Sequence, residues 1–357
     1  MANILIGADP ITSYLGQPKF IDAKGIKMKV MVSGAGALLG QGILRSLKNS
    51  TNKYHMLAAD PNPLSAGLYW QDDRFLLPMA KDKTFIPELI KLLQHTQPDV
   101  FIPGTDTELP ILARYKTEIE QKTQTKILVS SETVVEIADN KLVTAKFFEQ
   151  SGFSFPMTAG QNDSQKVQAI VQECGFPLIV KPTRGARSIG VVVVNSQAQL
   201  ETELAQCSGC IVQEYLSDAS GEFTAGAVVF DGKCDATIVM KRDLRDGNTY
   251  RATVVQDQAL EQMVRKWSEK LNPLGPANFQ FRINRNNEPT VFEINGRFSG
   301  TTPLRALVGF NEVEMVLHKM VYGTAVVQPV VQNKTILRHW SETVVDAADI
   351  SGVKYVS

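Results

Sequence analysis

Two neighbouring segments decide how the chain folds: Asn278-Phe279-Gln280-Phe281-Arg282 and Val291-Phe292-Glu293-Ile294-Asn295-Gly296-Arg297-Phe298-Ser299-Gly300. Each begins as an alternation of apolar and polar residues, which is typical of a β-strand. Asn286-Asn287 lies between them and predicts a hairpin turn. The two segments are therefore expected to pair as adjacent strands.

Oxygen-bearing side chains make these strands a candidate metal site. Because side chains alternate along a strand, Glu293 and Asn295 share one face, and Gln280 lies on the neighbouring strand. Carboxylate and amide oxygens without His or Cys suit Mg²⁺, which completes its coordination with waters and phosphates. The alternative is a buried structural Glu293 paired with Arg297 or Arg282, but three such ligands and an arginine are hard to explain as core.

The region after about residue 140 is expected to be α+β with mainly antiparallel sheets. Apolar residues recur at helical spacing in Lys141–Gln150 and Ser164–Cys174. Asp231-Gly232 predicts a second hairpin turn. The β-rich runs are Pro177–Lys181, Val191–Val194, Ile211–Tyr215, Glu222–Phe230, Asp235–Met240, Arg251–Val255, Ala277–Ile283 and Thr290–Ile294.

The region from residue 28 to about 130 has an α/β pattern. The apolar run Lys29–Val32 leads into the turn Ser33-Gly34-Ala35-Gly36 and then into apolar residues at helical spacing. Strands that alternate with helices predict a doubly wound parallel sheet, whose ligands bind at the carboxyl ends of the strands. Gly34, Asp60 and Gly104-Thr105-Asp106 lie at such ends. Further strands are expected at Tyr54–Ala59, Asp99–Ile102 and Lys126–Val129, and helices at Phe85–His95 and Glu108–Glu120.

The glycine-rich turn is a loose match to a dinucleotide-binding fingerprint. Gly34 and Gly36 are followed by Gly40, one residue away from the usual spacing, and by Asp60 after the next strand. Close packing of a helix on a strand needs the same glycines. A nicotinamide-dependent oxidoreductase that uses Gly34–Gly36 and is indifferent to Mg²⁺ is kept as the alternative from another functional class.

Two further segments have the composition of nucleotide-binding elements. In Ile179–Val192, a strand ends in Lys181 and is followed by a loop with two Gly, two Arg and a Ser, whose backbone N–H groups could approach phosphate oxygens. A solvated hairpin loop is the alternative. The strand Ile211–Leu216 ends in a short loop before Gly221-Glu222, so its backbone could pair with an adenine edge and an acidic side chain could bind ribose hydroxyls. Alone, that segment is only a strand with an acidic end.

Composition excludes several functional classes. The chain has 357 residues, with 37 Lys+Arg and 37 Asp+Glu, so no net charge attracts nucleic acid or an anionic membrane. No apolar run is long enough to span a bilayer, and a cytoplasmic protein is expected. The four cysteines are too few for a disulfide scaffold. Cys207 and Cys210 form a C-x-x-C that is expected to hold ordinary half-buried thiols, with zinc or redox chemistry as the alternative.

Taken in order, these segments resemble the ATP-grasp superfamily, in particular ligases similar to carbamoyl phosphate synthase. The resemblance covers residues 28–325 and implies a Rossmann-like domain at 28–137 before an ATP-grasp domain at 138–357, whose lobes span about 140–215 and 216–325. Residues 1–27 are expected to be a leader, an arm or an addition made for expression. The chain is too short for a complete carbamoyl phosphate synthase and has no glutamine-hydrolysing part, so a free-standing ligase is expected.

The resemblance also implies roles for individual residues. Lys141 and Lys181 would reach the nucleotide phosphates, and the loop Arg184–Gly190, with Gly185, Arg187 and Ser188, would close over them. The adenine hinge would be Gln213, Glu214, Tyr215 and Leu216, and Glu222 would hold the ribose. Gln280, Glu293 and Asn295 would bind two Mg²⁺ ions, for which Mn²⁺ could substitute. Arg297 and Lys181 would act on the transferring phosphoryl group, and Lys241, Arg242 and Arg251 would line the reaction chamber.

The activity implied is ATP-dependent ligation of a carboxylate to an amine through an acyl phosphate, on an amino acid or another small carboxylate. Phosphorylation of bicarbonate or carbamate is the alternative within the family. Substrates are expected to contact Asp243–Tyr250 and Thr301–Arg305, with Arg305 holding a carboxylate and Asp243 or Asp246 an amine. The expected partners are these small molecules and a second copy of the chain, with no nucleic acid and no membrane.

Overall fold

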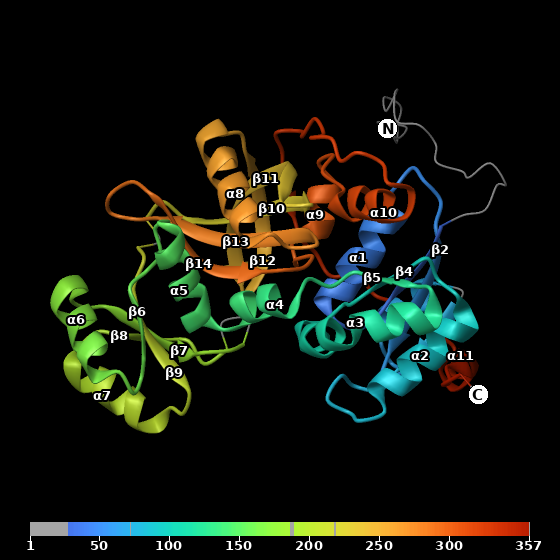
Figure 1. Cartoon of the computed structure of the whole chain (residues 1–357), viewed down its shortest axis with the longest axis horizontal. Coiled ribbons are helices and arrows are strands. Elements are labelled where there is room, and N and C mark those ends of the chain that lie inside the picture. Colours follow the sequence, from blue (N-terminus) through green and yellow to red (C-terminus); the bar gives the residue numbers. More distant parts are fainter. Residues whose placement is uncertain (1–27, 72, 186–188, 218, 357) are drawn as a thin grey trace, which may run out of the picture.

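The computed structural model describes residues 28–71, 73–185, 189–217 and 219–356, and it contains three β-sheets (Figure 1). The leader expected at residues 1–27, and the phosphate-loop residues Arg187 and Ser188, lie outside the described residues. No described helix is both long enough and apolar enough to cross a lipid bilayer.

An amino-terminal α/β unit is built on a five-stranded sheet of order β3-β2-β1-β4-β5, in which every pair is parallel. Val30 and Val32 pack on one face of this sheet with α1, and Met31 packs on the other with α2 and α3. The predicted parallel α/β arrangement is confirmed. The elements are β1 Lys29–Val32, α1 Leu38–Lys48, β2 His55–Asp60, η1 Ala66–Trp70, β3 Asp73–Leu76, α2 Phe85–Thr96, β4 Val100–Ile102, η2 Asp106–Glu108, α3 Leu109–Thr123 and β5 Lys126–Ile127.

A small lobe follows, built on an antiparallel sheet of order β6-β9-β7-β8 with its own apolar core. The helices before it begin at side-chain caps: Ser131 caps α4 and Asn140 caps α5, by accepting hydrogen bonds from backbone N–H groups of the first turn. The elements are α4 Glu132–Asp139, α5 Lys141–Ser151, β6 Thr158–Gly160, α6 Ser164–Cys174, β7 Leu178–Pro182, β8 Val192–Val194, α7 Gln197–Gln206 and β9 Cys210–Glu214.

A large lobe is built on a six-stranded antiparallel sheet of order β14-β13-β10-β11-β12-β15. The predicted turn Asp231-Gly232 joins β10 to β11, and both residues have positive φ, as a type I′ turn requires. Asp246-Gly247 has the same conformation, so β11 continues through the charged segment after Met240 where the sequence predicted a strand end. The elements are β10 Glu222–Phe230, β11 Lys233–Arg245, β12 Asn248–Val255, α8 Gln258–Leu271, β13 Gly275–Ile283, β14 Pro289–Asn295, α9 Thr302–Ala306, α10 Glu312–Tyr322, β15 Thr335–Leu337 and α11 Ala347–Gly352.

The two faces of the six-stranded sheet bury different partners. On one face, Phe223 stacks on Phe281 with ring centroids 5.1 Å apart, and Trp267 of α8 packs against them. On the other face, Met240 and Phe310 belong to a core that also contains Leu44 of α1. One apolar core therefore joins the large lobe to the amino-terminal α/β unit.

The end of the chain returns to the amino-terminal unit. After β15 pairs with β12, the chain runs to α11, which Figure 1 shows beside that unit. The Leu76 N–H donates to the Lys354 carbonyl at 3.0 Å, Arg74 forms an ion pair with Asp349, and Val353 is buried. The last residues, expected to close the ATP-grasp domain, therefore pack on the unit before it.

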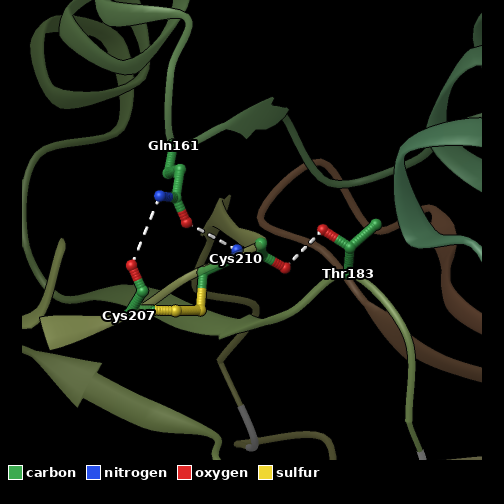
Figure 2. Close-up of a disulfide and its surroundings, with 5 residues drawn as sticks. Gln161, Thr183, Cys207 and Cys210 are labelled. Carbon is green, nitrogen blue, oxygen red and sulfur yellow. Dashed lines mark hydrogen bonds between the residues drawn. A yellow bond between two sulfur atoms is a disulfide. The ribbon is translucent and has the colours of Figure 1, made fainter.

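Cys207 and Cys210 are joined by a disulfide, which corrects the expectation of free thiols (Figure 2). Gly209, with φ +73°, turns the chain between α7 and β9 and brings the two Cα atoms to 6.1 Å. Gln161 holds this turn, because its Oε1 accepts from the Cys210 N–H at 2.7 Å and its Nε2 donates to the Cys207 carbonyl at 3.3 Å. The spacing alone does not reveal this turn.

Candidate active site

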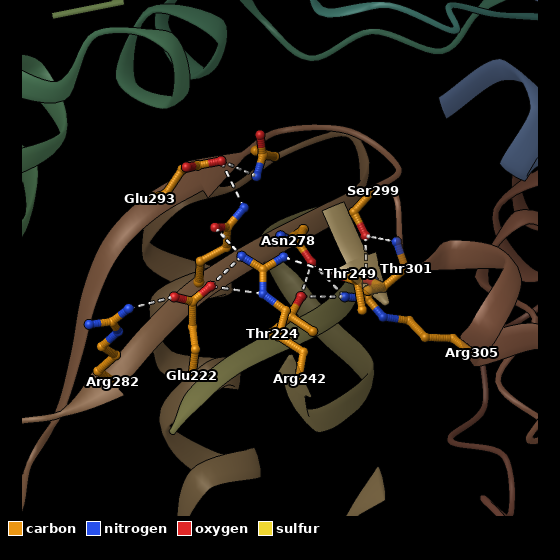
Figure 3. Close-up of polar contacts among 12 residues, drawn as sticks. Glu222, Thr224, Arg242, Thr249, Asn278, Arg282, Glu293, Ser299, Thr301 and Arg305 are labelled. Atoms are coloured by element: carbon orange, nitrogen blue, oxygen red, sulfur yellow. Dashed lines mark hydrogen bonds and ion pairs between the residues drawn. The ribbon is translucent and has the colours of Figure 1, made fainter. Parts of the chain in front are cut away.

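The three predicted metal ligands meet at the carboxylate of Glu293, which Figure 3 labels. Gln280 stands opposite Glu293 in the register of β13 and β14, and its Nε2 donates to Glu293 Oε1 at 2.7 Å. Asn295 Nδ2 donates to the same oxygen at 3.3 Å. A bulge at Phe292 turns Glu293 to this face while Val291 stays in the core.

Two lysines of the small lobe interact electrostatically with Glu293. Lys181 is buried at the end of β7, and burial lowers its pKa to about 8 although Glu293 opposes that shift. Burial also lowers the pKa of Lys141, at the start of α5, and Glu293 again opposes it. Lys141, Lys181 and Glu293, which lie far apart in the sequence, therefore form one charged cluster between the lobes.

The base of the expected phosphate loop is anchored to the start of α5. The Lys141 N–H donates to the Thr183 carbonyl at 3.0 Å, and Lys141 Nζ donates to the Gly185 carbonyl at 2.9 Å. The Arg184 guanidinium forms ion pairs with Glu136 and Asp139 of α4, so it points to that helix. Gly185 has φ +124°, a conformation that side chains disfavour.

The expected adenine hinge lines a cavity of about 340 Å³ between the lobes. Its lining includes Glu214, Tyr215 and Leu216 of the hinge together with Ile283 and Asn284 at the end of β13.

The hinge side chains serve the fold itself. Gln213 Nε2 donates to Thr158 Oγ1 at 2.8 Å, and Glu214 Oε2 accepts from the Met157 N–H at 3.1 Å. Both side chains are therefore engaged in contacts within the small lobe.

Glu222, the expected ribose ligand, is buried between two arginines. Its Oε1 accepts from Arg242 Nε at 2.9 Å, and its Oε2 accepts from Arg282 Nη2 at 3.0 Å. Arg242 also donates to Gln280 Oε1 at 2.6 Å. The carboxylate therefore belongs to a network that continues to Glu293, and Arg242 is the link between them.

Lys241 and Arg251 are not brought to this cluster, which corrects the expectation that they line the reaction chamber. Lys241 stands opposite the core residue Phe223, on the α8 face of the sheet. Arg251 stands opposite Asp243 on that face and forms an ion pair with it. Because neighbouring residues alternate between faces, Arg242, which lies between Lys241 and Asp243, points to the cluster.

Arg297, expected at the transferring phosphoryl group, is held by the amino-terminal unit. Its Nε and Nη2 donate to the two carboxylate oxygens of Asp106 at 2.6 and 2.9 Å. Sequence reasoning placed Asp106 at a ligand-binding strand end but did not pair it with Arg297. No local pattern signals a contact across 191 positions.

Arg305 is completely buried, so it does not offer a surface for a substrate carboxylate. Its Nη1 donates to Glu312 Oε1 and Oε2 at 3.0 and 3.2 Å, and its Nη2 donates to Thr224 and Asn278. A Cβ on Gly226 would lie 2.4 Å from Arg305 Nη1, so that glycine makes room for the guanidinium. Arg305 is therefore a core ion-pair residue.

The glycine-rich turn is filled by the chain's own atoms. The Gly36 N–H donates to Asp60 Oδ2 at 2.8 Å, and a Cβ on Gly36 would lie 2.3 Å from Ser65 Oγ. A Cβ on Gly40 would lie 2.2 Å from the Gly34 carbonyl oxygen. Close packing explains these glycines.

Family models match three parts of the chain in the predicted order. The model described as PylC-like, N-terminal domain, matches residues 31–128. The model described as D-ala D-ala ligase C-terminus matches residues 149–224, and that described as ATP-grasp in the biosynthetic pathway with Ter operon matches residues 206–344.

Curated relatives are distant and much longer. The chain is 26% identical over 233 residues to multifunctional protein pyr1-3 of Dictyostelium discoideum, covering 57% of this chain and 10% of that protein. It is 22% identical over 347 residues to the carbamoyl phosphate synthase large chain of Archaeoglobus fulgidus, covering 88% of this chain and 31% of that one. The chain thus spans a third or less of these relatives.

Solved structures share the fold. N5-carboxyaminoimidazole synthetase from Staphylococcus aureus has a TM-score of 0.67 at 15% identity, covering 86% of this chain and 81% of that one. The L-amino acid ligase from Bacillus licheniformis has a TM-score of 0.62 at 16% identity, covering 85% and 75%. None of this supports the oxidoreductase alternative, and the predicted fold, a Rossmann-like domain before two ATP-grasp lobes, is confirmed. The chain therefore contains an ATP-grasp domain, matched over residues 206–344, after a PylC-like amino-terminal domain, and it is similar in sequence to the carbamoyl phosphate synthase large chains.

Proposed function

We propose that the protein is an ATP- and Mg²⁺-dependent ligase that joins a small carboxylate, such as an amino acid, to an amine. The observation that carries this proposal is the cluster between the lobes, in which the carboxylate of Glu293 gathers Gln280 and Asn295 and interacts with Lys181 and Lys141. Hard oxygen ligands facing two ammonium groups suit the metal-bound phosphates of a nucleotide.

The donor set fits a magnesium ion. Glu293 supplies a carboxylate, and Gln280 and Asn295, which now donate to it from their amide nitrogens, would supply amide oxygens after their side-chain amides turn. When bound, Mg²⁺ neutralises phosphate charge during phosphoryl transfer. One or two ions would be held by these residues.

The chain's residues would act by position and charge. Lys141 and Lys181 bind phosphate oxygens, and the backbone of residues 214–216 holds the base in the hinge cavity. The substrate carboxylate attacks the γ-phosphorus, the bond to the ADP oxygen breaks, and Arg297 offsets charge on the transferring group. The amine then displaces phosphate from the acyl phosphate, and an amide forms.

A second candidate is phosphorylation of bicarbonate or carbamate. The sequence relation to carbamoyl phosphate synthase large chains, over 88% of this chain, favours it. The fold shared with an L-amino acid ligase is compatible with the first candidate. Both share the phosphoryl-transfer step and differ in the carboxylate.

The first experiment measures ADP release with ATP and Mg²⁺ against pools of amino acids, other small carboxylates and bicarbonate, with hydroxylamine present. ADP release that depends on one pool, together with a hydroxamate, supports the ligase and identifies the carboxylate class. Bicarbonate-dependent ADP release without a hydroxamate from any pool favours the second candidate. If no pool or bicarbonate stimulates ADP release, the proposed activity is wrong.

A further inference from the structure

The loop that carries Asp106 is fixed by its own hydrogen bonds. Asp106 begins η2, and Thr105 and Glu108 form a capping box around it. Glu108 is buried, and its Oε2 accepts from the Thr105 N–H at 3.0 Å and from Thr105 Oγ1 at 2.8 Å. The backbone on both sides of Asp106 is therefore held before any substrate binds.

The glycine-rich turn supports the same loop. A Cβ on Gly34 would lie 2.7 Å from Thr105 Cγ2, and a Cβ on Gly104 would lie 2.0 Å from the Ser33 carbonyl oxygen. The Gly104 N–H donates to Ser33 Oγ at 3.2 Å. The two glycines thus let the loop after β4 pack directly on the turn after β1.

The contact between Asp106 and Arg297 leaves part of the guanidinium available. An arginine has five N–H donors. Asp106 takes the Nε–H and one N–H of Nη2, and the Phe298 carbonyl accepts one from Nη1 at 3.0 Å. Among the described residues, no group accepts from the remaining N–H of each terminal nitrogen, and these two N–H groups match two oxygens of a phosphoryl or carboxylate group.

We propose that Asp106 is a positioning residue, which holds Arg297 through its Nε side so that its terminal nitrogens face the transferring phosphoryl group. This inference rests on the proposed function. The amino-terminal unit then contributes to the reaction through Asp106. The glycine-rich turn contributes by supporting the loop that carries Asp106. Asp106 touches no reacting atom in this role.

Three variants test the proposal in the full chain. D106N removes the negative charge, and R297K keeps a positive charge but loses the planar fork. D349N is the matched control, because Asp349 forms an ion pair with Arg74 between the end of the chain and the same unit, away from the site. We expect D106N to lower kcat about 10- to 100-fold with little change in the KM for ATP, and D349N to behave as wild type.

A double variant separates positioning from a general loss of structure. If Asp106 acts through Arg297, D106N has little further effect in the R297K background. The proposal is overturned if kcat of D106N is that of wild type, if the two effects multiply, or if D349N loses as much activity.

Binding of aluminium fluoride keeps the test independent of an identified substrate. ADP with Mg²⁺ probes the nucleotide site, and aluminium fluoride added to it mimics the transferring phosphoryl group. Wild type should bind ADP more tightly with aluminium fluoride, and D106N should lose most of that gain. Wild type that does not bind ADP contradicts the proposed function. Wild type that gains nothing, or D106N that gains as much as wild type, contradicts the role of Asp106.

Discussion

Gln280 and Glu293 stand opposite each other on β13 and β14, and the Gln280 amide donates to the Glu293 carboxylate at 2.7 Å. The other end of that amide accepts from Arg242, which also holds Glu222. A single hydrogen-bond network therefore links the expected metal ligands to the expected ribose ligand. A substitution at Glu293 is expected to affect the hydrogen bonds of the whole network.

Glu293→Gln should lower Mg²⁺-dependent ADP release by about 100-fold or more, because the only carboxylate among the expected ligands becomes neutral. Initial rates over a Mg²⁺ titration measure this effect. Glu288→Gln is the control, since Glu288 is exposed at the turn of the same hairpin. Turnover near that of wild type in Glu293→Gln would refute a metal-binding role.

The affinity for ATP should depend on pH through Lys181. Its pKa is lowered to about 8, so the ammonium that binds phosphate is charged below that pH and is lost above it. ATP affinity is therefore expected to be independent of pH below pH 8 and to fall above it, by up to about tenfold per pH unit. Titration calorimetry across this range checks the inflection.

Lys181→Arg is the control for that profile, because a guanidinium stays charged throughout the range. If the ATP affinity of this variant shows an inflection of equal size, the inflection belongs to another titrating group. The sign for stability is opposite: the buried ammonium destabilises the fold below pH 8. That cost is relieved at higher pH, where the unfolded chain binds more protons.

Arg305→Ala should destabilise the protein by about 3–5 kcal/mol, because Glu312 would be left as an unpaired buried charge. Denaturant unfolding measures this change. Arg285→Ala, on the exposed turn after β13, should stay within about 0.5 kcal/mol of wild type. A raised substrate requirement without loss of stability would instead return Arg305 to the substrate site.

Alkylation of the denatured chain tests the disulfide. Without reductant, only the free cysteines Cys174 and Cys234 should react, and after reduction all four should react. Because the bridge closes a very short loop, the double variant Cys207→Ser and Cys210→Ser should lose only about 2 kcal/mol of stability. Four reactive cysteines before reduction would show that the pair is a dithiol.

Local patterns predicted much of this architecture. Helical spacing and turn residues did so most accurately: α5 begins at Lys141, where the apolar spacing placed its start, and Asp231-Gly232 forms the expected turn. The helix α8 was not predicted. Its apolar residues Val264, Trp267 and Leu271 recur at helical spacing, but they lie among many charged residues that obscure the pattern. Nothing local pointed to η1 or β3.

The candidate site likewise contains residues that local patterns placed correctly and residues whose positions depend on tertiary contacts. The residues around Glu293 share one hairpin, so alternation brought them together correctly. Alternation also implied that Lys241 and Arg242 face opposite ways, but only the pairing with β10 decides which of them faces the site. The hydrogen-bond partners of Arg297 and Arg305 come from elements far away in the sequence. Local residue patterns cannot predict tertiary contacts of that kind.

The return of the chain end to the amino-terminal unit restricts how the site can open. That unit and the large lobe already share a core from Leu44 to Met240, and the contact of Leu76 with Lys354 ties them a second time. The small lobe has a separate core around Val180 and Val212. Nucleotide entry and product exit are therefore expected to move one wall of the site, while the wall that carries Glu293, Arg297 and Asp106 stays a single rigid block.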